Sequence, residues 1–223
     1  MKLSNYIFSY LKSQGLDTVF LVTGGGAMHL NDSIGRVEGL RFVCNHHEQA
    51  SAIAAEGYAR VANKPAILNV TTGPGGINAL NGVFGAFTDS IPMMVVSGQV
   101  KRETMLSSYN IPGLRQLGDQ EVEIVPMVKG ITKYAVTVTD PNTIRYHLEK
   151  ALYLTTHGRP GPCWLDIPVD VQAAMIDETS QKGFDPSELD RLDTSDLEKD
   201  VRKVVEKIAS AERPVMIGST GIR

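Results

Sequence analysis

The chain has 223 residues, 42% of them hydrophobic, which is enough for one substantial domain or for one domain and part of another. Its formal net charge is −3 at pH 7 and its 22 Lys and Arg residues are scattered, so it lacks the basic stripe typical of nucleic-acid-binding proteins. No apolar run approaches the roughly 20 residues of a membrane span, and the first helical segment lacks the unbroken apolar core of a signal peptide, so we expect a cytoplasmic protein.

Apolar strand-like segments alternate with helical patterns through the first three quarters of the chain. The strand-like segments are short and uninterrupted, which is typical of a parallel sheet covered on both faces. We therefore predict an α/β domain of three layers, with a mostly parallel central sheet and helices on both faces. In chain order the expected elements are a helix at 3–14, strands at 18–22 and 40–44, a helix near 48–62, a strand at 65–70, a helix near 77–87, a strand at 92–97, a polar loop at 101–120, a helix near 121–128, a strand at 134–138, a helix at 142–156 and a strand at 163–167.

The pattern changes after residue 172. Residues 173–196 are rich in Asp, Glu, Ser, Lys and Gln and poor in large apolar residues, which indicates an exposed linker. A helix near 195–210 and a strand at 214–221 then resemble the beginning of another α/β domain. The expected organisation is a complete domain at 1–172, a linker at 173–196 and the start of a truncated central domain at 197–223.

The two cysteines, Cys44 and Cys163, are far apart in the sequence and each lies in an apolar strand-like segment. Cytosolic proteins keep their thiols reduced. We therefore expect two buried, reduced thiols and no disulfide.

Two glycine-containing turns follow expected strands, where open α/β sheets bind ligands. Gly24-Gly25-Gly26 is a poor dinucleotide fingerprint, because His29 stands where G-x-G-x-x-G has its last glycine. A P-loop is excluded as well, because no glycine is followed by Lys-Ser or Lys-Thr. The turn at 71–76, TTGPGG, combines threonines that can cap, a proline that fixes φ and glycines that open the next helix with free N–H groups. It fits both a ligand-binding turn and a tight turn without a ligand.

The segment VCNHHEQASA at 43–52 places two histidines and a glutamate between an expected strand and helix. Adjacent histidines on an extended segment point to opposite faces, and H-E-x-x-H spacing is absent because position 51 is Ser, so we predict no metal site. Asn45 can cap the helix, and Glu48 can favour the positive end of the helix dipole. Glu48 can also be a shielded carboxylate that exchanges a proton with a bound base. The residues alone leave these two roles for Glu48 open.

Small residues line one face of each of two helices. They indicate close packing of backbone on backbone, typically at an interface between chains. These residues are Ser51, Ala52, Ala55 and Ala59 on one helix and Asn78, Gly82, Gly85 and Ala86 on the next.

Four segments occur in an order that is familiar from one enzyme family: VCNHHEQASAIAAEGYAR, NVTTGPGGINALNGVFGAFTDSIPMMVVSGQV, DQEVEIVPMVKGITKYAV and GRPGPCWLDIPVDVQ. Together they resemble the N-terminal, pyrimidine-binding domain of thiamine diphosphate enzymes, and most of all acetolactate synthase large subunits and their relatives. The resemblance covers about 1–172 and is much more specific than a single glycine pattern.

The resemblance implies a role for each candidate site residue. Glu48 would be the activating glutamate that hydrogen-bonds N1′ of the aminopyrimidine and promotes loss of the thiazolium C2 proton. Gly24, Gly25 and the turn at Thr72-Gly73 would lie against the pyrimidine, and Gln120 would lie near the substrate. A 2-oxo acid such as pyruvate would be decarboxylated and its two-carbon unit added to an acceptor carbonyl. In this family the site lies between two chains of a homodimer or tetramer, so the small-residue faces would be dimer surface.

The same resemblance predicts that the chain is incomplete as an enzyme. In the family a C-terminal domain holds the diphosphate and Mg²⁺ through a Gly-Asp-Gly motif, which is absent here, so we expect weak cofactor binding and no catalysis by residues 1–223 alone. FAD, which many acetolactate synthases bind mainly through the middle domain, is a further cofactor that the resemblance allows.

Two positions depart from typical acetolactate synthases and leave the acceptor open. Asp119 replaces a phenylalanine beside Gln120, and Thr23 replaces a proline before the first glycines. With Lys101, Arg102 and Arg115, the loop would suit a larger polar acceptor. The alternatives are therefore a 2-oxo acid decarboxylase, a nucleotide-sugar carboligase of polysaccharide synthesis and, outside enzymes, an α/β interaction module.

Overall fold

The computed structural model describes residues 1–109, 111–189 and 194–219. The chain divides into two compact units, Met1–Phe184 and Asp185–Arg223. The described residues of the first unit form a sheet of six strands in the order β2-β1-β3-β4-β6-β5, and every neighbouring pair is parallel. This confirms the predicted α/β class and parallel sheet. The strands are β1 (Thr18–Leu21), β2 (Arg41–Cys44), β3 (Ala66–Val70), β4 (Met93–Gln99), β5 (Tyr134–Thr137) and β6 (Pro162–Pro168).

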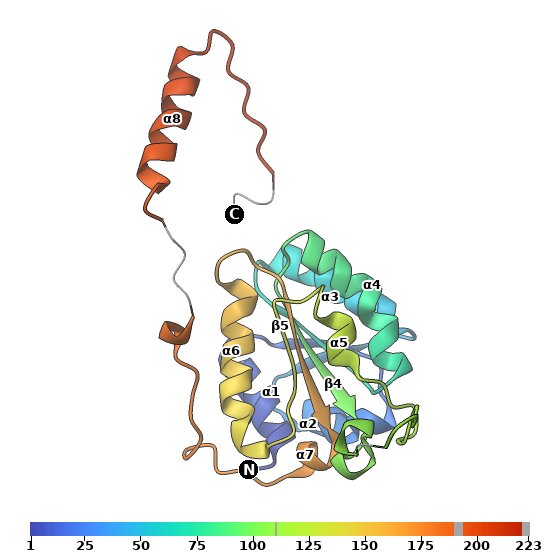
Figure 1. Cartoon of the computed structure of the whole chain (residues 1–223). Helices are drawn as coiled ribbons and strands as arrows, with labels where there is room; N and C mark the ends of the chain where they lie inside the picture. Colours follow the sequence, from blue (N-terminus) through green and yellow to red (C-terminus); the bar gives the residue numbers. More distant parts are fainter. Residues whose placement is uncertain (110, 190–193, 220–223) are drawn as a thin grey trace. The chain divides into compact units, whose positions relative to one another are not determined.

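Helices cover both faces of this sheet, with α1, α2 and α6 on one side and α3, α4 and α5 on the other (Figure 1). Alternate residues of a strand enter different cores, as the period of two requires. In β1, for example, Val19 packs in the first core and Phe20 in the second. The helices of this unit are α1 (Leu3–Ser13), α2 (Met28–Arg36), α3 (Glu48–Ala62), α4 (Pro74–Thr88), α5 (Ile124–Val128), α6 (Ile144–Thr156) and α7 (Val169–Ala173).

Several elements of this unit differ from the sequence-based expectation; α7, for example, was not predicted. Helix α2 was not predicted, although Leu30 and Ile34 are buried on one face at the i, i+4 spacing of a helix. Helix α4 begins at Pro74, because proline is well tolerated in the first turn, where its missing N–H has no intrahelical partner. Strand β4 continues to Gln99, two residues past its expected end, so the Gln99 side chain lies at the carboxyl end of the strand.

The small residues of α3 pack against α4 inside the chain. Ser51, Ala52, Ala55 and Ala59 are all buried within the unit, and a Cβ placed at Gly82 of α4 would lie 2.5 Å from the Cβ of Ala52. The expectation that this stripe forms dimer surface is therefore wrong, because its neighbour is a helix of the same chain.

Both cysteines are free, as expected, but only Cys163 is buried. Cys44 is exposed, because β2 lies at one edge of the sheet and all four of its residues are exposed. Burial raises the pKa of the Cys163 thiol to about 12, which keeps it protonated and unreactive.

The first unit extends beyond the boundary expected near residue 172. The Phe184 amide donates to Glu149 Oε2 at 2.8 Å, and the Arg145 amide donates to Gln181 Oε1 at 3.0 Å. Part of the segment expected to be a linker therefore packs on α6. The division into a complete domain, a linker and the start of a second domain stays a prediction.

The second unit contains α8 (Leu197–Ser210). Residues 214–219, where we expected a strand, form none, and 220–221 lie outside the described residues. A strand is stable only when neighbouring strands satisfy its backbone groups, and this unit offers no neighbour among its described residues. Across the described ranges, none of the helices has the length and hydrophobicity of a transmembrane segment.

Candidate active site

Five of the expected site residues follow the carboxyl ends of three neighbouring strands. Gly24 and Gly25 follow β1, Glu48 follows β2, and Thr72 and Gly73 follow β3. These strands are parallel and adjacent in the order β2-β1-β3, so their carboxyl ends meet where open α/β sheets bind ligands. The fold therefore brings these five residues to one place.

Gly24 and Gly26 allow the loop after β1 to pack directly on the turn after β3. A Cβ at Gly24 would lie 2.5 Å from Cβ of Thr71, and a Cβ at Gly26 would lie 2.9 Å from Cγ2 of Thr72. Gly25 differs, because nothing lies within 4 Å of a Cβ placed there. Packing therefore requires Gly24 and Gly26, whereas Gly25 borders open space that a ligand can enter.

Two side-chain amides hold this glycine loop. Asn31 Nδ2 donates to the carbonyl oxygen of Gly24 at 3.3 Å, and Gln172 Nε2 donates to that of Gly26 at 2.7 Å. On β4, a Cβ at Gly98 would lie only 2.1 Å from the same Gly26 oxygen. The loop is thus fixed by α2, β4 and α7.

The two threonines of the turn after β3 use their hydroxyls differently. Thr72 Oγ1 donates to Gln99 Oε1 at 2.6 Å in a buried hydrogen bond. Thr71 Oγ1 is buried and has no hydrogen-bond partner among the described residues, which is uncommon for a buried hydroxyl. Gly73 follows with φ +59°, a left-handed conformation that favours glycine, and a Cβ there would lie 2.0 Å from the carbonyl oxygen of Gln120. The turn therefore contacts the backbone of Gln120.

The cap of α3 differs from the expectation. His47 is the N-cap residue, and its Nδ1 accepts a hydrogen bond from the Gln49 amide at 3.1 Å. Asn45 instead donates through Nδ2 to Ser51 Oγ at 3.1 Å. In the described ranges, no group of three His, Cys, Asp or Glu side chains is placed to hold a metal ion.

Glu48 is the first residue of α3 and is half-buried. Its Oε2 accepts a hydrogen bond from Asn78 Nδ2 of α4 at 3.0 Å. Its Oε1 lies 3.5 Å from where a Cβ on Gly75 would stand. One oxygen is therefore held by Asn78, and the other lies on the side of the turn.

Gln120 has an unusual backbone conformation for its residue type, with φ +56°, and its side chain is exposed. The next side chain, Glu121, organises the preceding loop. Its carboxylate accepts hydrogen bonds from the backbone amides of Gly118, at 3.0 Å, and of Leu106. The structure thus places the backbone of Gln120 against the turn that contains Thr72 and Gly73.

In the polar loop expected to bind a large acceptor, one of the charged side chains already has partners within the chain. Arg102 pairs with Asp170 at 2.7 Å and donates to the carbonyl oxygen of Thr139 at 3.0 Å. Arg115 and Asp119 are exposed.

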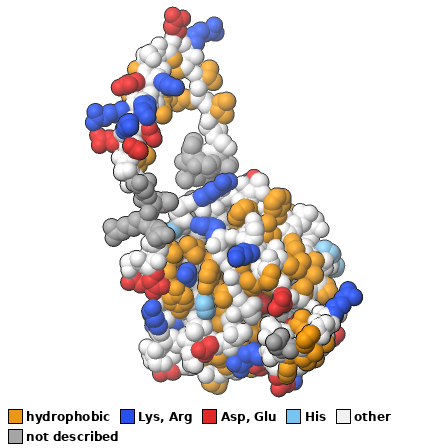
Figure 2. Space-filling view, in the orientation of Figure 1, with side chains coloured by type: hydrophobic (Ala, Val, Ile, Leu, Met, Phe, Trp, Pro, Cys, Tyr) orange, Lys and Arg blue, Asp and Glu red, His pale blue; other side chains and the backbone are white. Residues whose placement is uncertain are grey.

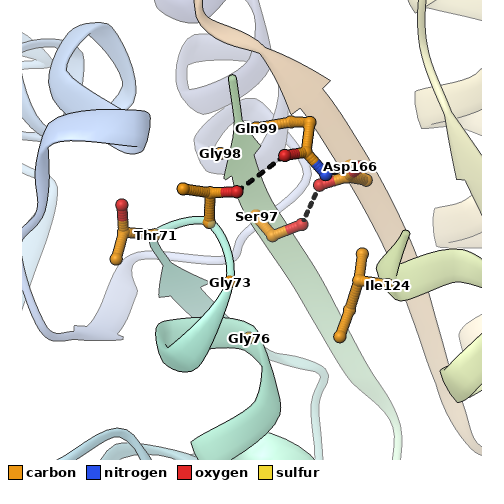
Figure 3. A pocket seen from close by; sticks show the side chains of 9 residues that line it. Thr71, Gly73, Gly76, Ser97, Gly98, Gln99, Ile124 and Asp166 are labelled. Atoms are coloured by element: carbon orange, nitrogen blue, oxygen red, sulfur yellow. Dashed lines mark hydrogen bonds between the residues drawn. The ribbon is translucent and has the colours of Figure 1, made fainter. Parts of the chain in front are cut away.

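A buried polar cluster behind the turn was not predicted. Asp166 of β6 is 1% exposed, and its carboxylate accepts from Ser97 Oγ at 2.6 Å (Figure 3). It also accepts from Gln99 Nε2 and from Thr137 Oγ1, at 3.2 Å each. Burial raises the pKa of the Asp166 carboxyl to about 6, against the lowering effect of these hydrogen bonds. The signal in the sequence was a charged residue inside the apolar run CWLDIP.

Comparison with known proteins agrees with this arrangement. Residues 1–127, more than half of the chain, match the family described as "Thiamine pyrophosphate enzyme, N-terminal TPP binding domain". The chain belongs to this thiamine pyrophosphate enzyme family. The matched region contains Gly24, Gly25, Glu48, Thr72 and the β4 residue Gln99, whereas Asp166 lies outside it.

Several relatives of this thiamine pyrophosphate enzyme chain are acetolactate synthases. The chloroplastic enzyme of Arabidopsis thaliana is 34% identical over 210 residues, which are 92% of this chain and 30% of the relative. The large subunit of Lactococcus lactis is 32% identical over 98% of this chain and 36% of the relative. The mitochondrial catalytic subunit of Saccharomyces cerevisiae is 33% identical over 97% and 31%. The chain thus spans about a third of the length of these relatives.

Proposed function

We propose that these residues are the N-terminal part of a thiamine-diphosphate-dependent carboligase of the acetolactate synthase type. The enzyme decarboxylates a 2-oxo acid such as pyruvate and adds the two-carbon unit to an acceptor carbonyl. The observation that carries this proposal is the placement of Glu48, held through one oxygen by Asn78 and open on the side of the glycine turn.

The residues at this edge fit the aminopyrimidine end of the cofactor. The unpartnered hydroxyl of Thr71 and the free space beside Gly25 offer a polar contact and room for a ring. Gly24, Gly25, Thr72 and Gly73 would hold the ring through backbone groups, since the Thr72 hydroxyl already donates to Gln99. When bound, thiamine diphosphate supplies an acidic thiazolium carbon and an electron sink for the decarboxylation.

Glu48 would perform the proton chemistry of this chain. Its Oε1 would hydrogen-bond N1′ of the pyrimidine and exchange a proton there, while Asn78 keeps Oε2 in place. Gln120 contacts the substrate from the segment that touches Gly73. We place the Mg²⁺ and diphosphate contacts outside residues 1–223, because the chain has no Gly-Asp-Gly motif. Any FAD would be held mainly by the middle domain.

We also propose that the site is completed by a second chain in a homodimer or tetramer. Exposed hydrophobic side chains lie on β2, which precedes Glu48, on α3, which begins at Glu48, and on α4, which packs against α3. Figure 2 shows hydrophobic side chains at the surface over the region of α4 and α5. Burying such a surface against another chain removes it from water and also shields the glutamate. The residues concerned are Phe42, Val43, Ile53, Val61, Ile77, Phe84 and Phe87.

Glu48→Gln in the intact protein that contains this chain tests the proposal. We expect turnover of pyruvate to fall by about 100-fold or more, because glutamine cannot exchange the proton. The matched control is Glu38→Gln. Glu38 is exposed and precedes β2, so it lies near the amino ends of the strands, away from the candidate site. Undiminished turnover in Glu48→Gln contradicts the assigned role. A wild-type protein that is inactive on every 2-oxo acid favours the interaction module instead.

The acceptor is identified by the product. Pyruvate supplied alone, with 2-oxobutyrate, or with a nucleotide keto-sugar distinguishes the decarboxylase, the acetolactate synthase type and the sugar carboligase. We expect the acetohydroxy acid product. The Arg102–Asp170 ion pair supports this choice, because it engages a cation that the diphosphate of a nucleotide sugar would otherwise use.

A further inference from the structure

Gln99 is a buried connection between three segments of the candidate site. The side chain is 2% exposed, and its Oε1 accepts from the Thr72 hydroxyl at 2.6 Å and from the Val100 amide at 3.0 Å. Its Nε2 donates to the Val122 carbonyl oxygen at 2.8 Å and to Asp166 Oδ2 at 3.2 Å. All the hydrogen-bonding positions of the amide are used, and the reversed amide would oppose donor to donor at Val100. Its orientation is therefore fixed.

Asp166 supplies the acceptor that this orientation needs. Ser97 Oγ accepts the indole N–H of Trp164 at 2.8 Å, so the single hydroxyl proton of Ser97 points to Asp166 Oδ1. Gln99 and Thr137 donate to the other carboxylate oxygen. The groups bonded to this carboxylate are uncharged donors. A buried carboxylate held in this way is costly compared with an apolar residue of similar size, so its presence calls for a role beyond packing.

The two segments joined by Gln99 are the two segments expected to meet the ligands. Thr72 precedes Gly73, whose position contacts the carbonyl oxygen of Gln120, and Val122 lies two residues after Gln120. Figure 3 shows Gln99 and Asp166 side by side on neighbouring strands, behind the turn that contains Gly73. A movement of the Gln99 amide would therefore shift the turn and the Gln120 segment relative to each other.

We propose that Asp166 is a positioning residue: through Gln99 it sets the spacing between the cofactor turn at 71–76 and the substrate segment at 120–122. The proposal rests on the proposed function for the identity of the ligands. It predicts that removal of the Asp166 carboxylate loosens both segments at once, although among the described residues its hydrogen bonds come from the side chains of Ser97, Gln99 and Thr137.

Asp166→Val in the intact protein is the main test, because valine leaves one N–H of Gln99 without an acceptor. We expect the half-saturating concentration of thiamine diphosphate to rise about tenfold. This change corresponds to about 1.4 kcal/mol, which is typical for the loss of one buried hydrogen bond. Asp166→Asn can keep an oxygen toward Gln99 and should restore most of the affinity. Thr137→Val removes another donor to the same carboxylate without touching Gln99, and we expect a change of less than about twofold.

A second measurement separates this inference from the proposed function. Amide hydrogen exchange without cofactor should be faster at 72–76 and 120–122 in Asp166→Val but not in Thr137→Val. If wild type shows no dependence on thiamine diphosphate, the proposed function fails, and exchange still decides the inference. Equal exchange and affinity in Asp166→Val and wild type, or equal effects of Asp166→Val and Thr137→Val, overturn it. If Asp166→Val does not fold, Gln99→Met replaces it, and a wild-type result for Gln99→Met overturns the inference as well.

Discussion

Asn78 Nδ2 of α4 donates a 3.0 Å hydrogen bond to Glu48 Oε2, which ties the first residue of α3 to the neighbouring helix. Because a carboxylate has two oxygens, this bond orients Glu48 and leaves Oε1 for the proposed contact with the cofactor. Under the proposed function, the rotamer of the glutamate is restricted before the cofactor binds, so less conformational entropy is lost on reaching the transition state.

Asn78→Ala should lower kcat in the intact protein by about tenfold, because Glu48 then loses a positioning hydrogen bond of roughly 1.5 kcal/mol. The matched control is Asn81→Ala on the same helix, whose side chain is exposed. Steady-state kinetics on pyruvate measure the effect. An equal decrease in both variants would show that α4 tolerates substitution poorly and that the bond to Glu48 has no special role.

Gly98→Ala should lower the stability of the protein, whereas Gly25→Ala should lower its affinity for the cofactor. A Cβ at Gly98 meets the Gly26 carbonyl oxygen at 2.1 Å, so we expect the free energy of unfolding to fall by about 2–4 kcal/mol. A Cβ at Gly25 meets nothing within 4 Å, so stability should change by less than about 1 kcal/mol while affinity for thiamine diphosphate falls. Denaturant unfolding of the 223-residue chain and cofactor titration of the intact protein check the pair. A destabilised Gly25→Ala would mean that packing, not a ligand, requires this glycine.

Asp166 should make the folded protein less stable as the pH rises. Its pKa is raised in the folded protein from the usual 3.8 to about 6, so the folded state binds this proton more tightly than the unfolded state. The stability from this group is fully present below pH 3.8 and is lost as pH rises through about 6. Asp166→Asn lacks this titrating group. Its free energy of unfolding, relative to that of wild type, should therefore rise by about 2–3 kcal/mol as the pH is raised from below 3.8 to above about 6. A difference that does not vary with pH contradicts the raised pKa.

Asp17 should act in the opposite direction. Hydrogen bonds from Lys64 at 3.1 Å, Thr18 at 3.0 Å and Tyr58 at 3.0 Å lower its pKa below the usual 3.8. Its contribution is present at neutral pH and is lost as pH falls below 3.8 toward the lowered pKa. The side chain is 40% exposed, so Asp17→Asn should cost only about 0.5–1 kcal/mol at pH 7. Urea unfolding at pH 7 and pH 3 measures this, and a larger loss at pH 3 would refute it.

Local patterns were sufficient for most of the fold. The short apolar strands, the alanine-rich helix α3 and the turn at 71–76 depend on residues close together in the sequence, so periodicity and turn chemistry predict them. The short helix α2 was missed because its sequence, MHLNDSIGR, has few apolar residues and no strong cap. The strand expected at 214–219 failed for a related reason, since a strand depends on partners that a local pattern does not contain.

The sequence by itself determined the α/β class, the family resemblance and the position of Glu48 at the start of the helix that follows a strand, because these follow from neighbouring residues and their order. Only the tertiary structure decided that the small face of α3 packs on α4, that Cys44 lies on an edge strand, and that Asp166 joins Gln99 and Ser97. Those last contacts link residues 67 and 69 positions apart. Strand order and register bring such residues together, and both result from packing the whole sheet at once.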